Sequence, residues 1–244
     1  MDQLSRERDY ELNISREKEA SVVSTFMANV FLWMFMALAI TGLTAYWVST
    51  SAGLLSMIYH PETGAPTILG WIVFLSPLGF VLLMSAGFHK FSANTLTLLF
   101  IIFALLLGMS LSSIFIVYTA ASLTKTFFIA AGMFGLMAVV GYTTKTDLTR
   151  FGSLMTMGLF GIIIAMVVNF FLKSAMMDYI ISVIGVLIFT GLTAYDVQML
   201  KKVGSGQAYD YDSTRKLVII GALRLYLDFI NLFLFLLRLF GNRR

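Results

Sequence analysis

Two aspartates near the C-terminal end of this chain lie inside strongly apolar segments. Asp196 falls in AYDVQMLKK and Asp228 falls in LYLDFINLF. An ionised carboxylate in the hydrocarbon core of a bilayer costs several kcal/mol unless it is protonated, paired or hydrated. Two carboxylates that face each other in a low-dielectric site cannot easily both ionise, so they would share a proton. The pair therefore predicts a proton-sensitive latch between two helices.

A structural role is the alternative for the same residues. Arg224 and Asn231 lie about one helical turn from Asp228, on the same helix face. Arg224 would then neutralise Asp228, and the pair would only tie helices together. In either case the polar face should point into the helix bundle. Whether Arg224 pairs with Asp228 or extends to the cytoplasmic surface decides how well the pair can respond to protons.

Further polar residues are candidates for modulating the aspartate pair. Tyr195 directly precedes Asp196, and Asn231 could contribute an amide oxygen beside Asp228. Lys90 closes an early apolar segment on the side nearest Asp196. A lysine at such a position usually extends its amine to the membrane surface. The sharper hypothesis is that Lys90 pairs with an aspartate and holds the bundle closed.

The composition requires a membrane around these residues. Of the 244 residues, 59% are hydrophobic and 12% are charged, and the mean hydropathy is +0.87. Soluble domains carry about 25% charged residues, so this chain cannot cover a soluble surface. The net charge of +4 comes from basic loop residues and does not indicate a nucleic-acid partner. The chain has no cysteine and only two histidines, which disfavours thiolate or histidine metal sites.

The apolar segments are long enough to be transmembrane helices. About 20 apolar residues are needed to cross the hydrocarbon core. The runs are continuous rather than alternating, so helices and not strands must satisfy the backbone. We predict one all-α membrane domain over residues 23–244, preceded by a charged tail over residues 1–22. The seven predicted spans are 24–48, 67–88, 95–118, 126–142, 152–172, 178–200 and 217–240.

The basic residues predict how these spans are oriented. With seven spans, the N-terminal tail and three of the loops share one side of the membrane. That side holds eleven Lys and Arg residues, and the other holds five. Positive residues are enriched on the cytoplasmic side, so the N-terminus is predicted to be cytoplasmic in a multi-pass protein.

The same residues carry a resemblance to a known family. LTAYDVQMLKK (192–202) and GALRLYLDFINLFLFLLRLFGNRR (221–244) resemble the last two helices of the Bax inhibitor-1/YccA-type family, also called TMBIM. GYTTKTDL (141–148) and LSSIFIVYTAAS (111–122) are similar to its bacterial YbhL-like branch. The similarity extends from about residue 20 to the C-terminus, and it implies a protein of the bacterial inner membrane.

The resemblance implies a fold and an activity. The fold would be two three-helix layers around a central C-terminal helix. The activity would be a pH-sensitive Ca²⁺ leak whose sensor aspartates correspond to Asp196 and Asp228, which would also hold Ca²⁺ weakly and transiently. A latching arginine of the family corresponds to Lys90, which keeps the charge but loses the bidentate fork. Arg224 departs from the small or polar residue that the family implies.

Three functional classes follow. The leading expectation is an ion leak with no resident cofactor, whose partners are the bilayer, Ca²⁺ and protons. The alternative is a regulator, without transport, that binds a membrane-bound AAA protease or another membrane partner through its charged tail. An intramembrane aspartyl protease is disfavoured. Such enzymes require Gly-x-Gly-Asp, where this chain reads Leu225-Tyr226-Leu227-Asp228, and a later Pro-Ala-Leu motif, whereas the last proline here is Pro77. We therefore expect no enzymatic activity.

Overall fold

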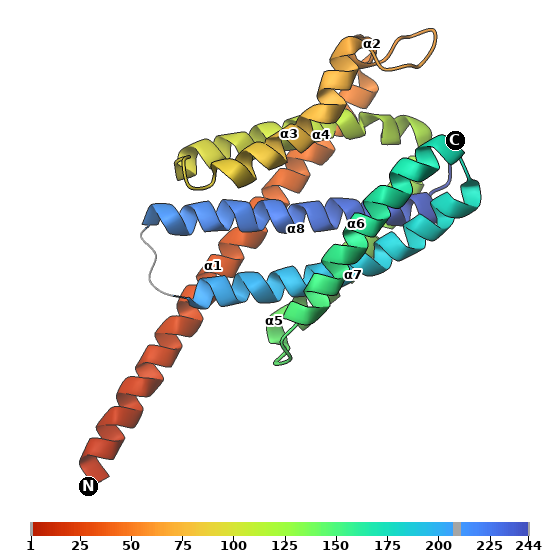
Figure 1. The fold of residues 1–244 in the computed structure, drawn as a ribbon. Coiled ribbons are helices and arrows are strands. Elements are labelled where there is room, and N and C mark those ends of the chain that lie inside the picture. The colour runs from red at the N-terminus through yellow and green to blue at the C-terminus, as the bar shows by residue number, and fades with distance from the viewer. Residues whose placement is uncertain (1, 207–210, 244) are drawn as a thin grey trace.

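The fold is a bundle of long helices (Figure 1). The computed structural model describes residues 2–206 and 211–243, and within them the side chains of residues 10, 18, 20–206 and 212–243. Every regular element in these ranges is an α-helix. The helices are α1 (Asp2–Thr50), α2 (Ala52–Ile58), α3 (Ile68–Gly87), α4 (Ala93–Val117), α5 (Ala120–Thr143), α6 (Thr149–Leu172), α7 (Ala175–Ser205) and α8 (Tyr211–Phe240).

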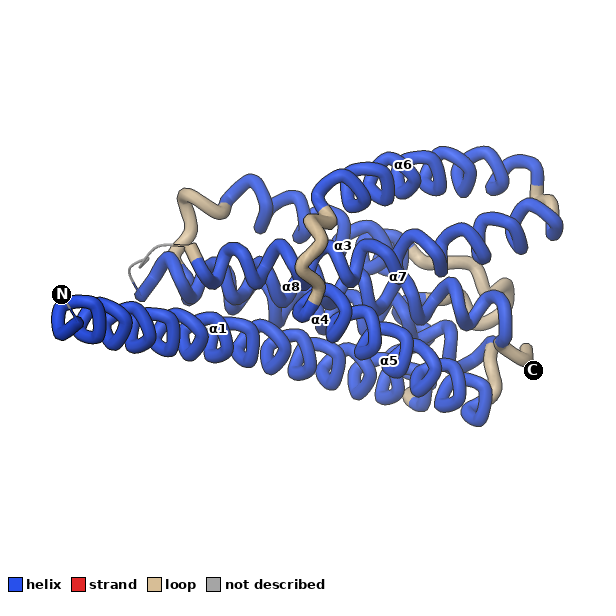
Figure 2. Tube along the Cα trace, turned by 90° about the horizontal axis from the view of Figure 1, so that it is seen from below, coloured by secondary structure: helices blue, strands red, loops and turns tan. Residues whose placement is uncertain are grey.

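The predicted spans are confirmed in number and type. Seven of the helices in the described ranges are long and apolar enough to cross a membrane. The first span is the apolar part of α1, residues 20–50, and α1 continues without a break through the charged tail (Figure 2). The short helix α2 was not predicted, because its seven residues are fewer than a transmembrane search requires.

Several helix ends differ from the predicted boundaries for local reasons. The fourth span was expected from residue 126, but the corresponding helix, α5, begins at Ala120 because the Thr119 side chain accepts the Ser122 N–H at 3.3 Å. The last span was expected from residue 217, but α8 begins at Tyr211. Lys216 pairs with Asp212 at 3.0 Å, one turn apart, and so supports a helical turn outside the apolar segment.

The C-terminal helix α8 is the most buried of the seven. In its most apolar stretch 67% of residues are buried, against 6% for α6. It packs against α1, α4, α5 and α7, whereas α6 packs chiefly on α7. A central C-terminal helix is therefore observed, and the division of the other spans into two layers stays a prediction.

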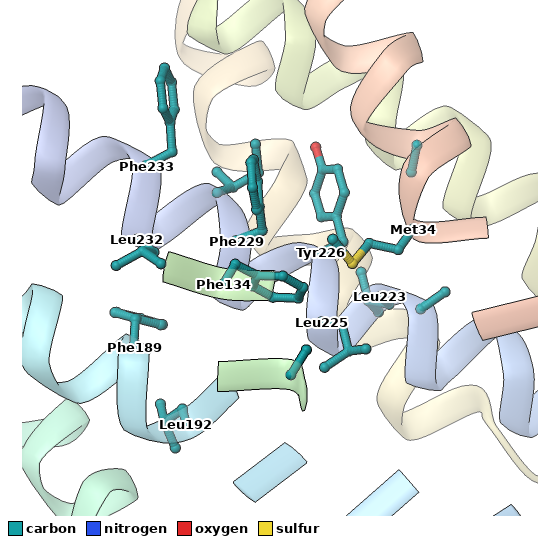
Figure 3. Packing of buried hydrophobic residues seen from close by; sticks show 14 of the residues in the cluster. Met34, Phe134, Phe189, Leu192, Leu223, Leu225, Tyr226, Phe229, Leu232 and Phe233 are labelled. Carbon is teal, nitrogen blue, oxygen red and sulfur yellow. The ribbon is translucent and has the colours of Figure 1, made fainter. Parts of the chain in front are cut away.

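Large side chains and glycines set the spacing around α8. Tyr226 is fully buried and lies edge-to-face on Phe100 and Phe103 of α4, with ring centroids 6.0 and 5.6 Å away. Figure 3 shows side chains from α1, α5 and α7 gathered around the α8 residues. At the contact between α1 and α4, a Cβ added to the buried Gly108 would lie 2.7 Å from the Thr41 carbonyl oxygen, so α4 needs glycine there to approach α1.

The two ends of the bundle differ in chemistry. At one end Lys202, near the end of α7, pairs with Asp147 in the α5–α6 loop at 2.7 Å. At the other end the Thr119 N–H donates to the Asn242 carbonyl at 3.2 Å, which ties the C-terminus to the α4–α5 turn. The α5–α6 loop and the α4–α5 turn thus lie at opposite ends of the bundle, as the two ends of one membrane-spanning helix, α5, must. A cytoplasmic N-terminus stays a prediction.

Candidate functional site

Asp196 of α7 and Asp228 of α8 meet inside the bundle. Their exposed fractions are 6% and 5%, and the two carboxyl groups lie close enough for a side-chain hydrogen bond to each other. Asp228 lies 12 residues from Phe240, the end of α8, which corresponds to about 18 Å of helix. The structure thus brings together the two carboxylates singled out in the sequence.

One oxygen of the pair is not satisfied by the surrounding protein. In the described part of the chain, Oδ2 of Asp228 is buried and has no hydrogen-bonding partner. Buried polar atoms are nearly always paired, and an unpaired one points to a functional role or to an unseen ligand. The site therefore has capacity for a proton or a cation at this oxygen.

Arg224 contacts Asp196, whereas the structural alternative paired it with Asp228. Its Nη1 lies 3.5 Å from Oδ1 of Asp196 and 3.2 Å from the Met199 sulfur. The guanidinium therefore reaches across to α7 instead of running along its own helix. Its side chain remains 46% exposed while that of Asp196 is 8% exposed. Arg224 thus connects the buried pair to the outside of the α7–α8 interface.

In the described part of the chain, the other proposed modulators form no hydrogen bond or ion pair with the two carboxylates. Lys90 is exposed in the turn after α3, and no ion pair joins it to an aspartate in the described residues, so the latch is not formed here. Tyr195 points toward α6, where its ring packs over Gly152. Asn231 donates its amide N–H to the Leu227 carbonyl at 2.8 Å on its own helix, which leaves its amide oxygen available.

A hydroxyl network fixes the opposite face of α8. The Thr41 hydroxyl of α1 donates to the Ala104 carbonyl of α4 at 2.9 Å. It lies 2.6 Å from the Tyr226 hydroxyl. Since the single Thr41 hydroxyl proton is used on Ala104, Tyr226 donates to Thr41. The network ties three helices together two residues from Asp228 and so sets the rotation of α8.

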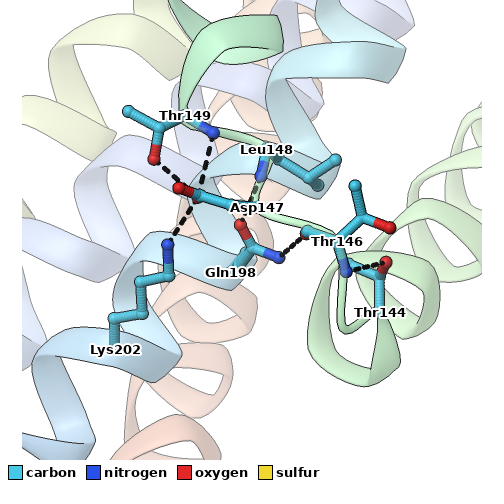
Figure 4. Close-up of polar contacts among 7 residues, drawn as sticks. All are labelled: Thr144, Thr146, Asp147, Leu148, Thr149, Gln198 and Lys202. Atoms are coloured by element: carbon cyan, nitrogen blue, oxygen red, sulfur yellow. Dashed lines mark hydrogen bonds and ion pairs between the residues drawn. The ribbon is translucent and has the colours of Figure 1, made fainter.

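A second polar cluster holds the C-terminal half of α7, and sequence reasoning missed it (Figure 4). Gln198, 6% exposed, accepts the Leu148 N–H at 2.8 Å and donates to the Thr146 carbonyl at 2.7 Å. A glutamine two residues after Asp196 inside an apolar span was the available signal. Its side chain clamps the α5–α6 loop to the helix that carries Asp196.

The exposed edge of this cluster contains an unusually acidic carboxyl. Hydrogen bonds from Lys202 and then from Thr149 lower the pKa of Asp147 to about 2. The Lys202 Nζ lies 2.7 Å from Oδ1 of Asp147, and the Thr149 hydroxyl donates to the same oxygen at 2.7 Å. Asp147 therefore remains ionised throughout the physiological pH range.

Comparison with known proteins finds one matching family model and several similar bacterial proteins. The family model described as inhibitor of apoptosis-promoting Bax1 matches residues 23–244. The chain is 47% identical over 223 residues to the inner membrane protein YbhL of Escherichia coli K12, covering 91% of this chain and 93% of that protein. It is 42% identical over 234 residues to an uncharacterized protein of Borreliella burgdorferi, covering 96% and 99%. An uncharacterized protein of Deinococcus radiodurans is 36% identical over 234 residues, covering 96% and 97%.

Proposed function

The chain belongs to the Bax inhibitor-1 family of multi-pass membrane proteins, and we propose that it is a pH-sensitive Ca²⁺ leak of the bacterial inner membrane. Protonation of the Asp196–Asp228 pair gates the leak. No resident cofactor takes part, and Ca²⁺ is the transported ion.

The observation that carries the proposal is the burial of two neighbouring carboxylates on adjacent helices. Ca²⁺ prefers oxygen ligands and takes about 6–8 of them at stable sites. Asp196 and Asp228 supply fewer oxygens, and backbone carbonyls and the Asn231 amide oxygen could add to them. Such a set holds Ca²⁺ weakly, which suits an ion in transit. The unpaired Oδ2 of Asp228 supplies one ligand that needs no existing bond to break.

Arg224 and protons would compete with the cation for the same carboxylates. The Arg224 guanidinium lies 3.5 Å from Asp196 and neutralises part of the charge that attracts Ca²⁺. Withdrawal of Arg224 toward water, where its side chain is already 46% exposed, would free Asp196 for the ion. The charged groups at the site are thus Asp196, Asp228 and Arg224. The two carboxylates attract Ca²⁺, and Arg224 competes with the ion for Asp196.

The test is Ca²⁺ flux into liposomes that contain the purified protein, measured between about pH 5 and pH 8, the range in which folded proteins tend to be most stable. We expect a pH-dependent flux that Asp196→Asn and Asp228→Asn each abolish or make independent of pH. Glu62→Gln is the matched control, because it also removes a carboxylate but lies exposed in the loop between α2 and α3. The proposal fails if both pair variants retain the flux and its pH profile.

A second candidate is a regulator engaged by a membrane-bound AAA protease. The regulator role is favoured because α1 is already helical from Asp2 to Ala20, where its apolar stretch begins. Eighteen residues of helix extend about 27 Å, which is long enough to offer a handle beyond the membrane surface (Figure 1).

The handle is tested by crosslinking and capture from membranes of a bacterium that expresses the chain with and without residues 2–19. Capture of a AAA protease by the full chain alone supports this function. Capture that does not depend on these residues, or no capture, counts against it. Measuring Ca²⁺ flux of the truncated chain in the same liposomes separates this role from the leak.

A further inference from the structure

A crevice lies between α1, α7 and α8 at the end of the bundle where the apolar stretch of α1 begins. Its volume is about 400 Å³. One wall is formed by α1, and the other is formed by the end of α7 and the beginning of α8. The polar residues on the α1 wall are Ser21, Thr25 and Asn29. They follow one another at intervals of one helical turn and therefore lie on one face of α1.

The polar wall reaches into the depth of the membrane. The apolar stretch of α1 begins at Ala20, and Asn29 lies about 13 Å further along the helix. A polar side chain at that depth is costly against lipid and is expected to face a water-filled cavity or the protein interior. Asn29 is exposed and lines the crevice, so the crevice is the place where its amide can be hydrated.

The opposite wall leads toward the two buried carboxylates. Val203 of α7 lines the crevice, and Asp196 lies two turns further into the bundle on the same face of that helix. Leu217 of α8 also lines the crevice, and Asp228 lies three turns further in on the same face. The crevice is therefore separated from the pair by about 10 Å along α7 and about 16 Å along α8.

A small apolar contact lies in this interval, and we call it the seal. It consists of Val30, Leu200 and Gly221, which are all buried. A Cβ added to Gly221 would lie 2.7 Å from Cδ2 of Leu200 and 3.4 Å from Cγ2 of Val30, so the three residues touch. On α7 the seal is one turn from Asp196, and on α8 it is one turn from Arg224. Because Gly221 has no side chain, a rotation of the Leu200 side chain alone would open the contact.

We propose that the crevice is the water-filled mouth through which cations reach the aspartate pair, and that the seal is the closed gate of this path. The inference rests on the proposed leak and adds the route of the ion to it. Hydroxyl and amide oxygens on the α1 wall are ligands of the type that replace water around a hard cation. Because these groups are neutral, they bind the ion more weakly than the carboxylates and let it move on.

The natural absence of cysteine from the chain makes the crevice directly testable. Asn29→Cys and Thr25→Cys each place a single thiol on the crevice wall. Ala28→Cys is the matched control, because this residue is exposed and adjacent to Asn29 but is not among the described residues that line the crevice. The probe is a cationic, membrane-impermeant methanethiosulfonate reagent, present on both sides of liposomes that contain the full chain.

The labelling rate measures whether water fills the crevice. The reagent reacts with the thiolate, and an anion forms far more readily in water than in hydrocarbon. We therefore expect Asn29→Cys to be labelled at least about tenfold faster than Ala28→Cys. Thr25→Cys should be labelled as rapidly as Asn29→Cys, because it lies one turn closer to the membrane surface on the same wall.

Ca²⁺ flux in the same liposomes measures whether the crevice lies on the path of the ion. Labelling of Asn29→Cys should abolish the flux, because the attached cationic group fills the crevice and repels Ca²⁺. Reduction of the mixed disulfide should restore the flux, which excludes damage to the fold. Ala28→Cys should retain its flux after it has been labelled to completion.

The seal is tested separately by shortening its side chains. Leu200→Ala should raise the flux several-fold, because it removes the side chain that closes the contact with Gly221. Val30→Ala should act in the same direction and serves as the second variant if Leu200→Ala does not fold. Leu223→Ala is the matched control, since it removes the same atoms from a buried residue of α8 outside the seal, and it should not raise the flux.

The outcomes distinguish this route from the leak itself. Equal labelling rates for Asn29→Cys and Ala28→Cys overturn the water-filled crevice. Rapid labelling that leaves the flux unchanged overturns its role as the mouth, and equal effects of Leu200→Ala and Leu223→Ala overturn the gate. Absence of Ca²⁺ flux from the unmodified chain refutes the proposed leak instead, and the labelling rates then still decide whether the crevice holds water.

Discussion

The hydroxyl network between α1, α4 and α8 allows a sharp test of how the aspartate-bearing helix is held. Tyr226 is fully buried and donates to Thr41 at 2.6 Å, while Thr41 donates to the Ala104 carbonyl at 2.9 Å. The two single substitutions should therefore lower the free energy of unfolding by different amounts. Tyr226→Phe removes one donor and leaves Thr41 bonded to Ala104. Thr41→Val leaves the buried Tyr226 hydroxyl without a partner and removes the side-chain bond to the Ala104 carbonyl, which keeps its helical hydrogen bond.

The expected free energies of unfolding follow from this asymmetry. Loss of one satisfied hydrogen bond costs about 1 kcal/mol, and a buried group left unsatisfied costs about 1–3 kcal/mol more. Hydrogen bonds between membrane helices fall at the low end, with an average near 0.6 kcal/mol. We expect Tyr226→Phe to cost about 0.5–1 kcal/mol and Thr41→Val to cost about 2 kcal/mol.

The double variant provides a further test of the predicted order of unfolding free energies. In the Thr41→Val background, Tyr226→Phe removes an unpaired hydroxyl, so the double variant should be more stable than Thr41→Val alone. Reversible unfolding in mixed detergent micelles measures each free energy. For a chain of this size about 1 kcal/mol corresponds to a shift of roughly 2–4 °C in Tm. Additive losses, or a larger loss for Tyr226→Phe than for Thr41→Val, would refute the assigned donor directions.

Three further predictions concern the surroundings of the site. Asp228→Asn should raise the free energy of unfolding at neutral pH by about 1–3 kcal/mol, because burying a carboxyl with an unpaired oxygen is costly; a Tm that stays level or falls contradicts this. Asp147→Asn should lower the free energy of unfolding equally from pH 5 to 8 and progressively less below about pH 4. The reason is that a carboxyl whose pKa is lowered from 3.8 to about 2 stabilises the fold only while it is ionised. Unfolding measured across pH 2–8 checks this, and a full loss of stability that persists at pH 2 excludes the ion pair as its cause. Gly141→Leu should prevent correct α5–α7 packing, since a Cβ there meets the Ala194 backbone. A Cβ at Gly135 meets nothing within 4 Å, so Gly135→Leu is the control. Size-exclusion chromatography should show a reduced yield of folded monomer for Gly141→Leu and an unchanged yield for Gly135→Leu.

The apolar runs and the buried carboxylates could be predicted from the sequence. Length and hydropathy alone determine that a segment such as 152–172 spans a bilayer, because the hydrocarbon core sets a minimum length. An aspartate in such a run must find a partner inside the protein, which is why Asp196 and Asp228 could be singled out. Helix ends were less predictable, because one side chain such as Thr119 decides where α5 begins.

The partners of the charged side chains were decided by tertiary structure. The spacing between Arg224 and Asp228 fits a helical pair equally well, but the crossing of α8 with α7 places Asp196 within reach of the guanidinium. Gln198 forms its hydrogen bonds to the α5–α6 loop only because this loop folds back onto α7. Hydropathy follows from local composition, whereas a side-chain contact depends on the rotation and register of two helices, and packing between distant segments sets both.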